Sequence, residues 1–296
     1  MDRAVWLSCC VTVDLRRVDA CRTHYSTNGI RLFYDDQGAG EPPLVFVHGF
    51  ACTHEDWQAQ VAFFQAQHRV IACDLPGHGA SEPPPDQGSV ESLGGAVASL
   101  LDALDMPPAV LIGHSMGCRV IIQATLNTPE RVAKLILLDG SCVGANNPQE
   151  AEQQTRQYMA KVGYRTMVES LFEAMFVEGA DPAMKDRVVK RAHELPEATG
   201  AHLFSRLVAW DAGKVDMALA QIKVPTYVLQ STYFNTELVR VSLPPGEITP
   251  WMERVQNHVA MTELDVISGV GHFPMLEVPD IVNAKMAAFI GKSIEG

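Results

Sequence analysis

One five-residue segment restricts the possible folds of this chain more than any other feature. Residues 113–117 read Gly-His-Ser-Met-Gly, and they stand between an apolar run at 109–112 and a helix-forming segment at 118–126. Glycines beside a serine allow neighbouring backbone to pass close to it, where side chains would collide. The pattern predicts a strained turn between a buried strand and a helix. The turn would expose the Ser115 hydroxyl and place a backbone N–H where negative charge can develop.

A serine hydroxyl is a weak nucleophile near neutral pH unless a histidine lies within hydrogen-bonding distance. His272 is the best-placed candidate, because it follows Gly271 on a loop between a strand-like segment at 263–267 and a helix-like segment at 280–290. Such a loop can bring a histidine over a serine on a central strand. For the following histidines we expect solvated surface positions instead: His24, His54, His68, His193, His202 and His258.

Four motifs stand in the order that they have in the α/β-hydrolase fold superfamily, which this chain resembles from about Tyr25 to the C-terminus. Residues 44–50 look like the strand and the oxyanion loop of that fold, and residues 74–81 resemble its D-x-x-G-x-G-x-S segment. The serine turn and the His272 loop complete the set. The resemblance implies an α/β fold with a mostly parallel central sheet, helices on both faces and an inserted helical cap.

The resemblance also implies roles for particular residues. Ser115 would be the nucleophile, and His272 would be the general base and then the acid for the leaving group. The backbone N–H groups of Phe50 and Met116 would form the oxyanion hole, where each donor typically contributes about 3–4 kcal/mol to transition-state stabilisation. His48 is expected to hold the shape of the loop that leads to Phe50.

The acidic member of the expected triad is the point at which the chain departs from the family pattern. Members commonly carry an aspartate after the strand that corresponds here to residues 224–229. In this chain Ser231 stands in place of the usual glycine and Phe234 in place of the aspartate. Asn235 and Glu237 are the nearest polar substitutes. An asparagine would orient the imidazole without compensating its positive charge, which would leave a slow hydrolase or a ligand-binding derivative.

Asp139 offers another source of the acid, since it ends the strand-like run 135–138. Some subfamilies take their acid from this strand end, and the chain order Ser115, Asp139, His272 matches the Ser, Asp, His order of the family. We therefore place Asp139 first, Glu237 second and Asn235 third as the triad acid.

The pattern of alternating strands and helices stops after Asp139. Residues 144–214 show only helical spacing, and we predict that they form the cap, inserted into a core made of residues 24–143 and 215–296. Methionine and aromatic side chains in this segment are expected mostly to pack the cap onto the core and in part to line an apolar pocket. These side chains are Met159, Met167, Phe172, Met175, Phe176, Phe204 and Trp210. The segment 239–251 is expected to form a loop over the site, with Trp251 as a wall.

The first 23 residues show no clear periodicity, and we predict a disordered N-terminal extension. Their apolar run at 5–13 is too short for a secretory signal and no cleavage site follows it. The seven cysteines of the chain are odd in number and scattered, a pattern more typical of a reducing compartment than of a disulfide framework. The sequence therefore favours a cytoplasmic location.

Composition excludes several other classes of protein. A formal net charge of −12 argues against a surface that binds nucleic acid or an anionic membrane. No apolar run of about 18 residues suggests a transmembrane helix. The chain carries no zinc-type spacing, P-loop or dinucleotide fingerprint, so neither a metal nor an organic cofactor is expected.

Together these features predict a carboxylesterase-like serine hydrolase, whose partner is a small-molecule ester or lactone. Serine at position 115 argues against an epoxide hydrolase or a dehalogenase, which form an ester on a carboxylate. Lactone hydrolysis, carbon–carbon bond cleavage and perhydrolysis by the same residues are alternatives. A ligand-binding receptor with little turnover is the alternative from another class. The sequence leaves the natural substrate and the oligomeric state open.

Overall fold

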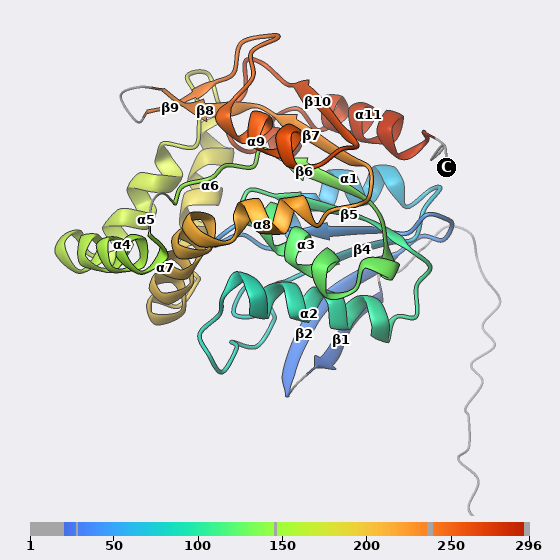
Figure 1. Cartoon of the computed structure of the whole chain (residues 1–296), viewed down its shortest axis with the longest axis horizontal. Coiled ribbons are helices and arrows are strands. Elements are labelled where there is room, and N and C mark those ends of the chain that lie inside the picture. The colour runs from blue at the N-terminus through green and yellow to red at the C-terminus, as the bar shows by residue number, and fades with distance from the viewer. Residues whose placement is uncertain (1–20, 28, 145–146, 236–238, 293–296) are drawn as a thin grey trace, which may run out of the picture.

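A single sheet runs through the centre of the computed structural model, which describes residues 21–27, 29–144, 147–235 and 239–292 (Figure 1). Its eight strands follow the order β1-β2-β4-β3-β5-β6-β7-β10. β1 pairs with β2, and β2 with β4, in antiparallel fashion, and the other neighbours pair in parallel. The strands are β1 (Cys21–Thr27), β2 (Ile30–Gln37), β3 (Leu44–Val47), β4 (Val70–Cys73), β5 (Ala109–His114), β6 (Val132–Leu138), β7 (Thr226–Gln230) and β10 (Thr262–Val266). The predicted α/β architecture is confirmed.

The central strands are buried on both faces of the sheet. Every residue of β3, β4 and β5 is buried. These strands read as nearly continuous apolar runs, as strands do in a parallel sheet covered by helices on both sides. β10 lies at the edge of the sheet, and all of its residues are only half-buried.

Helices cover both faces of the sheet. α1 contacts β4 and α11, whereas α3 contacts α2, β5 and α8. In Figure 1, α1 and α11 lie on one side of the strands and α2, α3 and α8 on the other. These helices and the short elements near them are η1 (His54–Trp57), α1 (Gln58–Phe64), α2 (Val90–Ala103), α3 (Met116–Asn127), η2 (Pro129–Arg131), α8 (Val215–Ala220), α9 (Pro250–His258), α10 (Pro274–Glu277) and α11 (Pro279–Ile290). None of the helices among the described residues is long and apolar enough to cross a membrane.

Five helices, α4 to α8, stand between β6 and β7, and the first four of them lie at the left of Figure 1. These four are α4 (Pro148–Val162), α5 (Tyr164–Glu173), α6 (Pro182–Ala192) and α7 (Glu197–Gly213). The side chains of Asn147 and Asp181 accept backbone N–H groups at the starts of α4 and α6, and a proline follows each. Of the predicted apolar residues, Phe176 and Phe204 are partly buried and the others are buried. The division of the chain into core and cap stays a prediction.

The N-terminal boundary of the sheet differs from the predicted one. Backbone pairing with β2 begins at Cys21, which lies opposite Asp36, so residues 21–23 belong to β1 and not to a disordered extension. The remainder of the predicted extension, residues 1–20, lies outside the described residues.

Candidate active site

Ser115 stands between the last residue of β5 and the first residue of α3, in a strained conformation. Its φ is 53° and its ψ is −114°, a region that typically costs about 1–3 kcal/mol for a residue other than glycine. A Cβ at Gly113 would lie 2.4 Å from the carbonyl oxygen of Gly117, and a Cβ at Gly117 would lie 2.4 Å from that of Val47. Both glycines are therefore required by close backbone contacts, as the sequence pattern predicts.

The loop after β3 lies directly against this turn. A Cβ at Gly49 would come within 3.3 Å of the Ser115 Cβ, and Phe50 and Met116 line the same pocket as Ser115. His48 is buried, and its Nε2 accepts the Leu75 N–H at 2.9 Å while Nδ1 lies 2.7 Å from the Gly49 oxygen. Burial, followed by the nearby His78, lowers the pKa of His48 to about 3. A neutral His48 thus ties the loop to the chain after β4.

His272 and Asp139 form a buried pair beside Ser115. The Nδ1 atom of His272 lies 2.5 Å from Oδ2 of Asp139. Asp139 follows β6 directly with a φ of 43°, and it is fully buried. Parallel neighbours β5 and β6 end at the same edge of the sheet, which brings Ser115 and Asp139 together.

Backbone and side-chain donors stabilise the charged form of Asp139. Its Oδ1 accepts the N–H groups of Ser231 at 2.7 Å and Thr232 at 2.8 Å, and its Oδ2 also accepts the Thr232 hydroxyl at 2.6 Å. Burial alone would raise the pKa of Asp139, but the hydrogen bond and charge of His272, the Arg240 charge and the Thr232 hydroxyl lower it to about 2. The carboxylate is thus ionised throughout the physiological range.

Of the two alternatives to Asp139, only Asn235 lies in the described part of the chain. Asn235 follows β8 (Thr232–Phe234), and its Oδ1 accepts the N–H of Val239 at 2.9 Å, within the connection to β9 (Arg240–Ser242). Glu237 lies outside the described residues. In other family members the segment after β7 usually supplies the acid. In this chain the same segment supplies two N–H donors to Asp139, from Ser231 and Thr232.

The second nitrogen of the His272 ring, Nε2, is buried and has no hydrogen-bond partner among the described residues. Burial and then the positive charge of Arg240 lower the pKa of His272 to about 4, against the opposing effect of Asp139. His272 is therefore neutral at pH 7 and has an open proton acceptor. His114 holds the His272 loop in place, because its Nε2 lies 2.7 Å from the backbone oxygen of His272.

Two buried arginines in the pocket were not anticipated from the sequence. Arg119 lies one turn after Ser115 on α3 and makes a bidentate pair with Asp211 of α7, at 2.6 Å for each contact. It also donates to the backbone oxygens of Ser115, at 3.2 Å, and Ser141. Arg240 lies at the start of β9, with its Nη1 atom 3.1 Å from Nδ1 of His272. A charged residue on a helix face or a short strand gives no sequence signal of its own, so only tertiary contacts reveal both.

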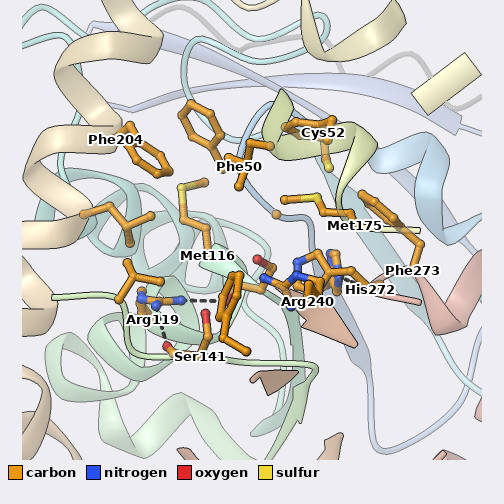
Figure 2. A pocket seen from close by; sticks show the side chains of 18 residues that line it. Phe50, Cys52, Met116, Arg119, Ser141, Met175, Phe204, Arg240, His272 and Phe273 are labelled. Atoms are coloured by element: carbon orange, nitrogen blue, oxygen red, sulfur yellow. Dashed lines mark hydrogen bonds between the residues drawn. The ribbon is translucent and has the colours of Figure 1, made fainter. Parts of the chain in front are cut away.

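These side chains surround a pocket that contains Ser115 and His272 and has a cavity volume of about 60 Å³. Figure 2 shows Phe50, Phe204 and Cys52 in the upper part of this pocket and Arg119, Ser141 and Arg240 in the lower part. The predicted helical segment contributes several of the apolar lining residues, among them Phe172, Met175 and Phe204.

Two smaller predictions about the surroundings of the site were wrong. Trp251 is in α9, not in a loop, and its buried ring packs against Gly140 and does not line the pocket. His54 was expected in solvent, but its Nδ1 lies 2.8 Å from Oδ1 of Asp74, the first residue of the D-x-x-G-x-G-x-S segment. Among the residues with described side chains, no group of three or more His, Cys, Asp or Glu is arranged to hold a metal ion.

Comparison with known proteins identifies the family of this chain. The profile described as "Alpha/beta hydrolase family" matches residues 44–285, a span that includes all of the site. The chain belongs to the alpha/beta hydrolase family. Its members therefore provide the relevant comparisons for the site.

Relatives of this chain within the family have diverse names. It is 33% identical over 194 residues to the dihydrolipoyllysine-residue acetyltransferase component of the acetoin cleaving system of Pseudomonas putida, covering 58% of this chain and 52% of that protein. It is 28% identical to 3-oxoadipate enol-lactonase 2 of Acinetobacter baylyi, covering 64% of this chain and 71% of that protein. The chain thus spans about half the length of the first of these relatives.

Among solved structures, a thermophilic esterase from Thermogutta terrifontis with bound malate superposes with a TM-score of 0.75 at 25% identity. That comparison covers 92% of this chain and 98% of the esterase. A lactone-degrading enzyme, Est816, gives a TM-score of 0.73 at 24% identity and shows the shared fold.

Proposed function

We propose that this protein is a serine hydrolase that cleaves carboxylic esters through an acyl-enzyme intermediate. The observation that carries the proposal is the His272–Asp139 pair at 2.5 Å in the pocket that exposes Ser115. The esterase and the enol-lactonase to which the chain is similar support an ester or lactone bond as the target.

In the first half of the proposed reaction, Oγ of Ser115 attacks the ester carbonyl carbon while Nε2 of His272 takes the hydroxyl proton. The backbone N–H groups of Phe50 and Met116 stabilise the oxyanion, and their stabilisation acts mainly on the transition state. His272 then donates its proton to the leaving alcohol. The carbon–oxygen bond of the ester breaks, and the acyl group stays on Ser115.

In the second half, Nε2 of His272 takes a proton from water, which attacks the acyl-enzyme. Collapse of the second tetrahedral intermediate releases the carboxylic acid and returns the proton to Ser115. Asp139 keeps the hydrogen of His272 on Nδ1, so that Nε2 is the acceptor, and stabilises the imidazolium that forms in each half.

A lactone can enter the same sequence of steps, with its alcohol tethered to the acyl group. The similarity to an enol-lactonase is the observation in favour of this second candidate. A receptor without turnover would require neither the ionised Asp139 nor the open Nε2 of His272, so these features favour an enzyme.

The first test is hydrolysis of p-nitrophenyl esters with acyl chains of increasing length, together with γ-butyrolactone derivatives. We expect turnover by the wild type and its loss in Ser115→Ala. Ser170→Ala is the matched control, because Ser170 lies exposed on α5, outside the pocket. A fluorophosphonate should label Ser115 in the wild type. A well-folded protein that turns over none of these compounds and takes no label would refute the proposal.

A further inference from the structure

Arg240 is a buried cation beside the candidate triad, and within the described part of the chain it forms no bidentate pair with a carboxylate. Its side chain lines the pocket, and the residue is 9% exposed. Among the described residues, the carboxylate oxygen nearest to its guanidinium is Oδ2 of Asp139, at 3.7 Å. Asp139 already accepts hydrogen bonds from Ser231, Thr232 and His272, so it does not form a bidentate pair with the guanidinium.

Arg119 provides the internal comparison. Both of its contacts to Asp211 are 2.6 Å long, and the two charges compensate one another within a fully buried pair. The same pocket therefore contains Arg119, which forms a close bidentate pair, and Arg240, whose contact with Asp139 is longer and involves one nitrogen. A buried guanidinium without such a partner is unfavourable unless another group compensates its charge.

The contacts of Arg240 with the protein use one side of its guanidinium. Nη1 donates to Oγ1 of Thr232 at 2.7 Å, and the guanidinium carbon lies 4.4 Å from the centre of the Phe234 ring. Nη1 is also 3.1 Å from Nδ1 of His272, but that nitrogen carries the hydrogen donated to Asp139 and cannot accept another. Nε and Nη2 have no hydrogen-bond acceptor in the described part of the chain, although Arg240 borders the pocket.

In the proposed reaction the positive charge of Arg240 becomes less well compensated by Asp139. When His272 becomes an imidazolium, Asp139 faces two cations, and the second of these is Arg240. An anionic group on the substrate would compensate the guanidinium at that moment and favour protonation of His272. Since Arg119 is neutralised by Asp211, one negative charge on the substrate is sufficient.

We propose that Arg240 binds a carboxylate of the substrate, so that the pocket selects esters or lactones that carry a second, ionised acid group. The inference rests on the proposed function, whose substrate class it specifies. The planar guanidinium offers Nε and Nη2 in the geometry that a carboxylate accepts. The pocket has the matching polarity, because Phe50 and Phe204 lie away from Arg240 in Figure 2, where an apolar part of the substrate would contact them.

The test compares a half-ester with a neutral molecule of the same shape. Monoethyl adipate and ethyl adipamate differ only in a carboxylate that is replaced by an amide. We expect wild-type kcat/KM to be higher for the half-ester by about tenfold or more, the usual effect of a charge-assisted hydrogen bond. Homologues from succinate to suberate locate the best spacing, and glycolate esters place the carboxylate on the alcohol side.

Substitutions then identify the group responsible. Arg240→Gln should reduce the ratio of the two kcat/KM values to near one, mainly by raising KM for the half-ester, and Arg240→Lys should restore part of it. Arg254→Gln is the matched control, because it removes a positive charge from an arginine that is 36% exposed and pairs with Asp216 outside the pocket. It should leave the ratio unchanged.

A second measurement needs no variant at that position and so does not depend on its folding. Hexanoate should inhibit wild-type hydrolysis of p-nitrophenyl butanoate competitively, with an inhibition constant about tenfold or more below that of hexanamide. The role of Arg240 would be overturned if kcat/KM were equal for the half-ester and the amide of every pair and if hexanoate and hexanamide had equal inhibition constants. Ester hydrolysis itself would still be observed in that case. Loss of both rates in equal proportion in Arg240→Gln would overturn it as well. Failure of the proposed function is a different result: neither ester would be hydrolysed by the wild type.

Discussion

The carboxylate of Asp139 lies 2.5 Å from Nδ1 of His272, although 133 positions separate the two residues in the chain. Asp139 follows β6 directly, and His272 is on the loop after β10, which pairs with β7. The acid therefore reaches the histidine from the strand next to β5, which ends at the Ser115 turn.

Asp139→Asn should lower kcat for ester hydrolysis by about 10³–10⁴, because an amide neither stabilises the imidazolium nor holds the correct tautomer of His272. Asn235→Ala and Glu237→Gln should each lower kcat far less, because Nδ1 of His272 is already paired with Asp139. Steady-state kinetics with p-nitrophenyl butanoate would check this. A large loss in Glu237→Gln with an active Asp139→Asn would assign the acid to the other segment.

The pH dependence of kcat/KM should report the lowered pKa of His272. His272 acts as a base only when neutral, so activity should be present above its pKa of about 4 and be lost as the pH falls through that value. Asp139, with a pKa of about 2, stays ionised over this range.

Arg240→Gln removes a positive charge from beside His272 and should move the acidic limb of this profile to higher pH. Asp139, Arg119 and His114 also act on His272, and this substitution changes none of them. The measurement uses a neutral ester, so that substrate charge does not contribute. An unchanged acidic limb in a folded Arg240→Gln would show that the Arg240 charge does not reach the imidazole.

Breaking the buried Arg119–Asp211 pair should be strongly destabilising. Arg119→Met or Asp211→Asn leaves one charge buried without its partner, which typically costs about 3–5 kcal/mol of unfolding free energy. The double variant should recover much of that loss. Lys214→Gln is the control, because Lys214 and Glu91 form a pair whose side chains are 57% and 40% exposed, and such pairs contribute about 1 kcal/mol or less. Urea denaturation of the wild type and the four variants measures the free energy of unfolding. Equal losses of unfolding free energy from breaking the two pairs would contradict this prediction.

Two glycine-to-alanine substitutions in helices should have opposite effects on stability. In Gly117→Ala the new Cβ would lie 2.4 Å from the Val47 oxygen, and we expect a loss of more than about 3 kcal/mol. In Gly95→Ala, within α2, the nearest atom is 3.9 Å away, and the better helix propensity of alanine should stabilise the protein by about 0.5–1 kcal/mol. Thermal or urea unfolding would measure both, and a stable Gly117→Ala would contradict the close contact.

Lowering the pH should reduce the stability of the protein already at pH values well above the pKa values of its carboxylates. Burial lowers the pKa of His48 to about 3 and those of His78 and His272 to about 4. Below pH 6.5 these histidines bind protons in the unfolded chain but not in the folded one. The free energy of unfolding therefore falls by about 1.4 kcal/mol per histidine for each pH unit. His54 acts in the opposite sense, since its pairing with Asp74 raises its pKa despite partial burial. Urea denaturation at pH 7 and pH 5 measures the net effect, and equal stability at the two pH values would contradict it.

Local sequence was sufficient to predict the Ser115 turn and the candidate histidine. The glycines at 113 and 117 are constrained by contacts within a few residues or with the adjacent strand, and the position of His272 follows from its place between two recognisable elements. The sequence left three acids open, because the family position after β7 carries Phe234 and the distance from each candidate to His272 is a property of the assembled sheet.

The sequence by itself determined the order of strands and helices, the α/β architecture and the family, since each of these depends on the pattern of apolar residues and on short motifs. Only the tertiary structure decided that Asp139 lies against His272, that Trp251 is buried away from the pocket, and that Arg119 forms a close pair with Asp211 while Arg240 lies beside Asp139 at 3.7 Å. The physical reason is that hydrogen bonds and charge pairing act over a few ångströms between segments far apart in the chain. Residue spacing along the chain carries no record of those distances.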